Sequence, residues 1–188
     1  MEELMRAIVR IFGTSILAGS LLAMSVLPVS AYNYSGYHWD THTVYWDDGW
    51  SIGWMPTEFA LGITVAASRW NNTAANFNLT YSPGSGLDWY VNNMGASETL
   101  ASTWPTYNGN TITNKYTVFN TYHSWSYGGG GGTYDTVTVA LHEFGHWLEL
   151  DHVYGFFDQS KVMFWLYTGV KQTLHSDDIN GIIYIYGT

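Results

Sequence analysis

The segment from residue 142 to residue 152 constrains this chain most, because it places three histidines and a glutamate at the spacing that one metal ion requires. His142 and His146 are four residues apart, so on a helix both rings lie on one face and can bind a single ion at about 2.0 to 2.1 Å. His152 follows too late for the same face of a continuing helix. The helix must therefore end near Glu149, and the chain must turn back so that His152 completes three protein ligands.

Glu143 supplies the group that a catalytic metal site needs beside its ligands. It is adjacent to His142 and within reach of the open fourth coordination position, where it can take a proton from zinc-bound water. From the composition of this chain, His-Glu-x-x-His is expected by chance in roughly 1 chain in 100, and with the third histidine in roughly 1 in 3000. The apolar residues of 136–141 lead into the motif at helical spacing. The pattern predicts one zinc ion on a buried helix.

These residues resemble the signature of the metzincins, His-Glu-x-x-His-x-x-Gly-x-x-His followed by a turn that bears a methionine under the zinc. Within that group the chain is most similar to the matrixins, the matrix metalloproteinase family. Met163 in Lys161-Val162-Met163-Phe164 matches the Met-turn, and the Asp-Asp-Ile-Asn-Gly-Ile string from Asp177 matches the C-terminal helix. Further patches of resemblance lie upstream, at Trp39, residues 41–45 and Trp70.

The resemblance implies a fold and an activity. The fold is α+β, with a twisted, mostly parallel sheet, an antiparallel edge strand, an active-site helix, a Met-turn and a C-terminal helix. The activity is zinc-dependent hydrolysis of peptide bonds in a protein or peptide substrate. The family also implies substrate-binding positions: Leu100 and Ala101 on a strand that pairs with the substrate, Trp165, Leu166 and Tyr167 on the pocket wall, and Thr138 at the depth of the pocket. Because a side chain longer than that of Thr138 would shorten the pocket, the resemblance favours a large apolar residue after the cleaved bond. Trp165 replaces the family's usual proline, which leaves the shape of the pocket open.

Two departures from the family pattern stand out. Glu149 occupies the position of the glycine that ends the helix in a left-handed conformation, which costs a non-glycine residue about 1 to 2 kcal/mol. The histidines that hold a structural zinc are absent, since Ala101-Ser102-Thr103 and Val118-Phe119-Asn120 stand there. We therefore expect one catalytic zinc and no structural zinc.

Residues 1–31 are predicted to be a signal peptide. Arg6 and Arg10 precede an apolar run from residue 11 to 27, and Val29-Ser30-Ala31 provides the small residues for cleavage after Ala31. A retained membrane anchor is the weaker alternative, because the run from residue 11 to 27 is shorter than the roughly 20 apolar residues that a spanning helix needs. We expect a secreted, extracellular, monomeric protein with one catalytic domain over 32–188 and no membrane attachment after cleavage. By resemblance, the new ammonium of Tyr32 would pair with Asp177.

Composition excludes several classes of function. The net charge is −9, which argues against binding nucleic acid through its phosphates. The absence of cysteine excludes disulfides, thiol catalysis and a cysteine-based zinc site. Aromatic residues make up 18% of the chain. We expect most tryptophans in the core or the cleft, with a carbohydrate-binding surface as the alternative.

The pattern of apolar residues and turn residues along the mature chain predicts the order of helices and strands of an α+β fold. We expect a strand at 43–46, a helix from Pro56 to about Asn71, short strands around 78–81, 88–91, 99–104 and 116–121, a glycine loop at 128–132, the active-site helix and a C-terminal helix within 174–187.

Weaker signals leave alternatives open. His38 and His42 lie where the pattern is extended, so a second metal pair is disfavoured, and His123 and His175 stay unassigned. Four aspartates in polar segments could offer oxygen ligands to calcium, with solvated loop carboxylates as the default: Asp47, Asp48, Asp88 and Asp135. Two other functions compete with the zinc endopeptidase. One is a non-catalytic extracellular binding or adhesion protein on a decayed metzincin scaffold, and the other is a peptidase with two histidine ligands and a distant glutamate.

Overall fold

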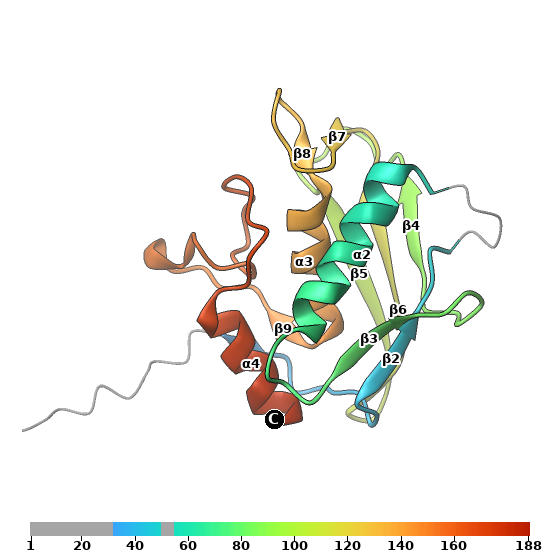
Figure 1. The fold of residues 1–188 in the computed structure, drawn as a ribbon, viewed down its shortest axis with the longest axis vertical. Coiled ribbons are helices and arrows are strands. Elements are labelled where there is room, and N and C mark those ends of the chain that lie inside the picture. Colours follow the sequence, from blue (N-terminus) through green and yellow to red (C-terminus); the bar gives the residue numbers. More distant parts are fainter. Residues whose placement is uncertain (1–31, 50–54) are drawn as a thin grey trace, which may run out of the picture.

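The computed structural model describes residues 32–49 and 55–188, so the predicted signal peptide lies outside the described residues. The elements run in the order β1 (Asn33–Tyr34), β2 (Thr43–Trp46), α2 (Thr57–Asn71), β3 (Asn78–Tyr81), β4 (Trp89–Asn92), β5 (Ala101–Asn108), β6 (Thr111–Asn120), β7 (Trp125–Ser126), β8 (Tyr134–Asp135), α3 (Thr136–Trp147), β9 (Leu150–Asp151), the 3-10 turn η1 (Phe156–Asp158) and α4 (Ser176–Tyr186). Figure 1 shows α2 and α3 side by side on one face of the sheet, with α4 below them.

The sheet is mostly parallel with one antiparallel edge strand. β2 pairs with β3 and β4 pairs with β6 in parallel, whereas β5 runs antiparallel to β6. The two parts join at Asp47, whose N–H donates to the Leu87 carbonyl at 2.9 Å and whose carbonyl accepts from the Trp89 N–H at 3.0 Å. The strand order is therefore β3-β2-β4-β6-β5, with β5 at the edge beside α3. This confirms the fold that the resemblance implied.

The β5–β6 hairpin is longer than the sequence predicted. The expected strands at 99–104 and 116–121 are observed as 101–108 and 111–120. Pro105 directly follows the expected end of the first strand, and the strand continues through it because an edge strand tolerates proline on the side that makes no ladder bonds. Gly109 has a φ of 62° and forms the tight turn with Asn110.

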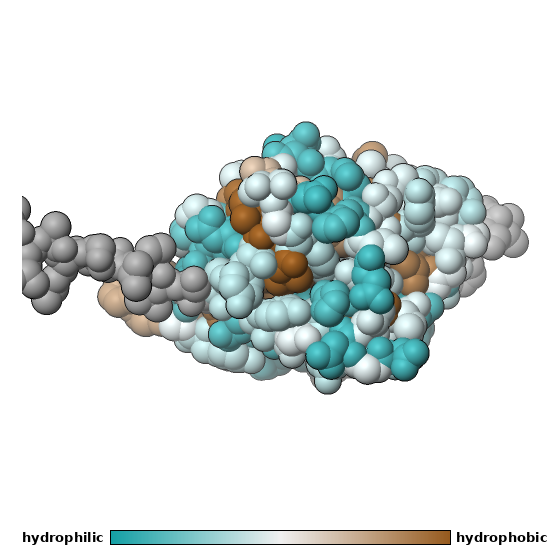
Figure 2. Space-filling view, turned by 90° about the horizontal axis from the view of Figure 1, so that it is seen from below, coloured by the Kyte–Doolittle hydropathy of each residue, from teal (hydrophilic) through white to brown (hydrophobic). Residues whose placement is uncertain are grey.

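The core lies between the helices and the sheet. The apolar stripe that predicted α2 is buried as expected, and Trp70 at its end donates its indole N–H to the Leu141 carbonyl at 3.1 Å. Trp89 on the sheet stacks with Trp147 of α3, with ring centroids 5.7 Å apart. Seen from below, hydrophobic residues show as separate small areas among polar ones (Figure 2).

Most described tryptophans contribute to this core, in line with the prediction. Trp39, Trp46, Trp70, Trp89 and Trp147 are buried. Trp104 and Trp165 are 39% and 51% exposed. Trp50 and Trp54 lie outside the described residues.

No helix within 32–49 and 55–188 is long and apolar enough to cross a membrane.

Candidate active site

The active-site helix α3 begins at a buried cap. Asp135 is fully buried, and its carboxylate accepts from the N–H groups of Val137 at 3.3 Å and Thr138 at 3.0 Å. It also accepts from the Gly128 N–H at 2.8 Å, at the start of the glycine loop. The sequence-based default of a solvated loop carboxylate is therefore wrong for Asp135. A buried N-cap satisfies helix donors that would otherwise lack partners.

The helix ends where the histidine spacing requires. Leu148 follows the last helical residue, and Glu149 takes a φ of 67°, the one positive φ at a non-glycine among the described residues. This left-handed residue turns the chain into β9, and His152 follows directly. The backbone therefore keeps the turn that the family builds with glycine.

The turn brings the three imidazoles together. The Nε2 atom of His142 lies 3.1 Å from that of His146 and 3.0 Å from that of His152, and the remaining pair is 3.2 Å apart. Nitrogens at zinc bonding distance in a tetrahedral site lie about 3.3 Å apart, so the donor set fits one zinc ion. Within the described chain, these residues are the only group of three or more metal-ligating side chains close enough to share an ion.

Backbone carbonyls orient two of the rings. The Nδ1 atom of His142 lies 2.8 Å from the Val162 carbonyl, and that of His146 lies 2.8 Å from the Leu150 carbonyl. Such bonds place the proton on Nδ1 and leave Nε2 as the free donor atom. Burial lowers the pKa of His142 to about 4 and also lowers the pKa values of His146 and His152. Near neutral pH the rings are therefore neutral, as metal binding requires.

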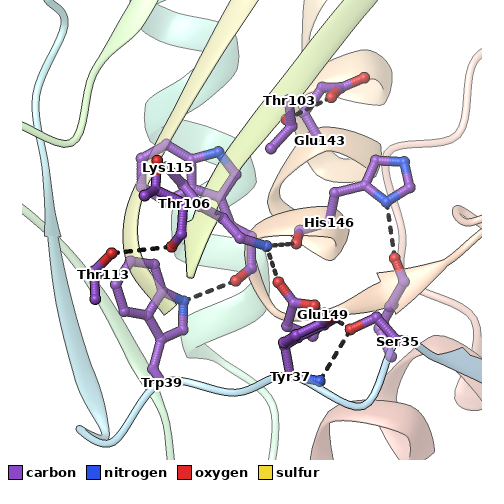
Figure 3. Close-up of polar contacts among 12 residues, drawn as sticks. Ser35, Tyr37, Trp39, Thr103, Thr106, Thr113, Lys115, Glu143, His146 and Glu149 are labelled. Carbon is purple, nitrogen blue, oxygen red and sulfur yellow. Dashed lines mark hydrogen bonds and ion pairs between the residues drawn. The ribbon is translucent and has the colours of Figure 1, made fainter. Parts of the chain in front are cut away.

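Glu143 lies beside the triad in a buried position. Burial raises the pKa of its carboxyl to about 7, and a hydrogen bond from the Thr103 hydroxyl at 2.7 Å opposes this rise. Thr103 comes from the edge strand β5 and points toward Glu143 (Figure 3). Its oxygen also lies 2.7 Å from the hydroxyl of Thr117 on β6. Sequence reasoning missed Thr103. The sequence did contain one indication of it. Thr103 lies two residues after Ala101, and on a strand such side chains point to the same face.

Met163 is a buried packing residue against α3, the helix that carries His142 and His146. It is 1% exposed, and a Cβ added to Gly145 of α3 would lie 2.1 Å from its sulfur, so the thioether packs directly against the helix backbone. The buried Asp178 of α4 accepts from the N–H groups of Val162 at 3.0 Å and Met163 at 3.2 Å. The C-terminal helix therefore holds the turn in place.

A cleft of about 870 Å³ opens over the triad. Its lining includes every substrate-binding residue predicted from the sequence: Leu100, Ala101, Thr138, Trp165, Leu166 and Tyr167. Thr138 is 6% exposed, and its hydroxyl donates to Asp135 at 2.6 Å and accepts from the Lys171 N–H at 2.8 Å. Lys171 also lines the cleft, and sequence reasoning did not identify it.

A family model for matrixins matches residues 58–187, which is more than two thirds of the chain. The chain belongs to the matrixin family. Matrixins are zinc metallopeptidases, and the match covers the triad, the Met-turn and α4 of this matrixin. No curated protein matches the chain.

The position of the family glycine carries a buried ion pair in this matrixin. Glu149 pairs with Lys115 of β6, and the side chain of each is 2% exposed. Burial lowers the pKa of Lys115, whereas the neighbouring carboxylate acts in the opposite direction. Sequence reasoning identified the unusual residue at 149 but not its partner, which lies 34 positions earlier.

Asp177 has a cation partner that the sequence did not indicate. Its carboxylate lies 2.9 Å from Lys161 Nζ, which also contacts Asp158 at 2.8 Å. Tyr32 packs against the same helix, because its ring centroid lies 5.6 Å from that of Tyr184 at a tilt of 42°, and a Cβ on Gly181 would meet the Tyr32 ring at 3.0 Å. The predicted pairing of the Tyr32 ammonium with Asp177 stays a prediction.

The weaker candidates have local partners. His38 lies 3.4 Å from Asp40, and His42 Nδ1 lies 2.7 Å from the Asn76 carbonyl, so the two histidines have separate partners. Asp88 accepts from the Tyr90 hydroxyl at 2.6 Å. Asp47 accepts from the N–H groups of Asp48 and Gly84. A calcium site at these aspartates stays untested.

Proposed function

We propose that this chain is a secreted zinc-dependent endopeptidase with Glu143 as its general base. The observation that carries the proposal is the convergence of three neutral Nε2 atoms beside one buried carboxylate at the floor of a cleft. His142, His146 and His152 would hold the zinc. This arrangement has the three protein ligands and open position of a catalytic zinc rather than the closed shell of a structural one.

The chemistry divides between the metal and the chain. When bound, zinc lowers the pKa of a water and polarises the peptide carbonyl. Glu143 accepts the proton of the attacking water and then hands it to the leaving amine. Burial raises the pKa of Glu143 in the metal-free chain, and a carboxylate with a raised pKa is a better proton acceptor than an exposed one. The hydroxyl of Thr103 holds the carboxylate toward the cleft.

The edge strand gives the substrate its place. β5 pairs with β6 on one side, and Leu100, Ala101 and Thr103 line the cleft near the other. An extended peptide can add to this edge through main-chain hydrogen bonds, so affinity depends little on sequence while pockets select side chains. Thr138 lines the cleft with a short side chain where a longer one would shorten the pocket, which favours a large apolar residue after the cleaved bond.

Secretion rests on residues 1–31. Arg6 and Arg10, the apolar run that follows them and the small residues before position 32 support export and cleavage after Ala31. Calcium binding at the four aspartates named from the sequence, Asp47, Asp48, Asp88 and Asp135, is a further expectation.

Degradation of casein and gelatin by the secreted protein tests the proposal. We expect cleavage that stops on addition of a zinc chelator and returns when about one equivalent of zinc is restored. One zinc bound per chain without any chelator-sensitive cleavage would contradict the proposal. That result would favour the non-catalytic binding protein, for which the exposed aromatics are the main support.

The ligand set has its own test. The distance of 3.0 Å between the Nε2 atoms of His142 and His152 favours three histidine ligands over two histidines and a distant glutamate. His152→Ala should therefore lower the zinc content well below one per chain. Retention of full zinc would support the alternative with two histidines and a glutamate.

A further inference from the structure

Three side chains from distant parts of the chain meet at the turn between the second and third histidines. Lys115 of β6 donates to Glu149 Oε1 and to the carbonyl of His146. The hydroxyl of Ser35, just after β1, donates to the other carboxylate oxygen of Glu149. Figure 3 shows Glu149 between Lys115 and Ser35, directly below the end of the active-site helix. Both carboxylate oxygens and the ammonium therefore have partners.

The same turn is held by the backbone of the N-terminal segment. β1 pairs antiparallel with β9, so that Tyr34 lies opposite Leu150. The Ser35 N–H donates to the Glu149 carbonyl at 3.3 Å, and the side-chain Nδ2 of Asn33 donates to the His152 carbonyl at 2.6 Å. Residues 149–152, which end on the third histidine, are thus held between β6 and the residues that follow the predicted cleavage site.

The ion pair is poorly explained by stability alone. Two buried charges lose their hydration, and an apolar pair of similar volume is often as stable or more so. Glutamate is also disfavoured at a φ of 67°, where glycine fits without strain. The charged groups at this turn provide a fixed geometry. Hydrogen bonds to both Glu149 carboxylate oxygens and to the His146 carbonyl allow only one arrangement.

The contact with His146 connects the cluster to the metal site directly. The His146 carbonyl is one of the last of α3, and it accepts a backbone hydrogen bond from the Glu149 N–H at 3.1 Å, just beyond the end of the helix. The Lys115 ammonium binds it at the negative end of the helix dipole. One cation therefore fixes the backbone of the second histidine and, through Glu149, the start of the segment that carries the third.

We propose that Lys115, Glu149 and Ser35 are positioning residues for zinc, which replace the family glycine with a clamp that sets the distance between His146 and His152. The proposal rests on the zinc site of the proposed function. It assigns a role to the N-terminal segment of the mature chain, because Ser35 closes the clamp. Positioning groups of this kind commonly change metal affinity about 10- to 100-fold when they are removed.

Two measurements on the full mature protein test the proposal. The first is zinc affinity by competition with a chromogenic chelator, and the second is thermal unfolding of the metal-free form. Glu149→Gly should weaken zinc binding about 10- to 100-fold, although glycine suits the turn. The double variant Lys115→Met, Glu149→Gly removes both charges, so its metal-free stability should recover toward wild type while its zinc affinity stays at least about tenfold weaker. A purely structural pair would restore both quantities together.

Milder and unrelated changes complete the set. Ser35→Ala removes one hydrogen bond and should weaken zinc binding about three- to tenfold without preventing folding. Leu79→Ala serves as the control for lost stability, because Leu79 is buried on β3, which packs against β2 and α2. It should lower the unfolding temperature and leave zinc affinity within about twofold.

Two results would overturn the proposal. The first is wild-type zinc affinity in the double variant. If the double variant does not fold, the deciding result is wild-type zinc affinity in Ser35→Ala. If the wild-type protein itself binds no zinc, the proposed function fails instead, so the two failures are distinguishable.

Discussion

At the scale of single residues, Glu143 carries the most specific expectation. Its pKa is about 7 when folded, against 4.5 as the ordinary value, because burial disfavours the charged form. Between these two values the folded, metal-free protein keeps a proton that the unfolded chain releases. The contribution of Glu143 to stability is therefore fully present below about pH 4.5 and is lost as pH rises through about 7.

Glu143→Gln, which cannot titrate, tests this sign in the metal-free protein. The variant should gain about 2 to 3 kcal/mol of unfolding free energy relative to wild type between about pH 5 and about pH 8. Urea unfolding of both proteins at each pH measures the difference. A difference that does not change with pH would mean that the carboxyl is ionised throughout.

Thr103 is expected to act through Glu143. Thr103→Val removes the hydroxyl 2.7 Å from the carboxylate at nearly constant volume, so kcat should fall about tenfold with little change in KM. Thr103→Ser keeps the hydroxyl and should restore most of the rate. Equal kcat in all three proteins would show that the hydrogen bond does not orient the base.

At the scale of elements, the Met-turn is a packing device between α3 and α4. Met163→Leu nearly conserves volume, so it should cost less than about 1.5 kcal/mol of unfolding free energy and keep most activity. Met163→Ala leaves a cavity and should cost about 2 to 5 kcal/mol. Chemical denaturation measures both, and loss of zinc in the leucine variant would contradict a packing role.

Local patterns predicted the helices well. The apolar stripe from Phe59 to Trp70 predicted α2 to within a residue, since helix periodicity and end signals are both local. The histidine spacing predicted the end of α3 near Glu149, because one ion cannot bind rings on diverging faces. The hairpin was predicted less well, because Pro105 is tolerated only at an edge position and no local pattern shows which strand is at the edge.

The contacts that organise the site could not be predicted. Lys115 and Glu149 are 34 residues apart, and Thr103 and Glu143 are 40 apart. Nothing in the sequence near Lys115 distinguishes a buried ion-pair lysine from one on the surface. Such pairs are set by strand register and helix placement, which only the assembled fold determines.

At the scale of the whole molecule, the first residues that the structure describes are tied to the half of the chain that carries the histidine triad. Tyr32 packs on α4, one turn from Asp177, and Trp39 donates its indole N–H to the Trp147 carbonyl at 2.8 Å. A chain that begins at Tyr32 has a charged ammonium close to this helix, whereas an uncleaved chain has an amide there.

We predict that the protein that starts at Tyr32 is more stable and more active than those that start at Ala31 or Tyr34. The gain should exceed the 0 to about 1 kcal/mol of a surface pair only if the ammonium joins Lys161 at the Asp177 carboxylate in a partly buried site. Thermal unfolding and peptide cleavage of the three proteins measure it. Equal values in all three would remove the proposed pair.

The most direct test of the zinc peptidase is Glu143→Ala, assayed for zinc content and for casein cleavage in one preparation. The substitution removes the base and touches no proposed ligand, so the variant should hold one zinc per chain, keep its fold and lose activity about 10²- to 10⁴-fold. A variant that holds its zinc and cleaves at near wild-type rate would contradict the account.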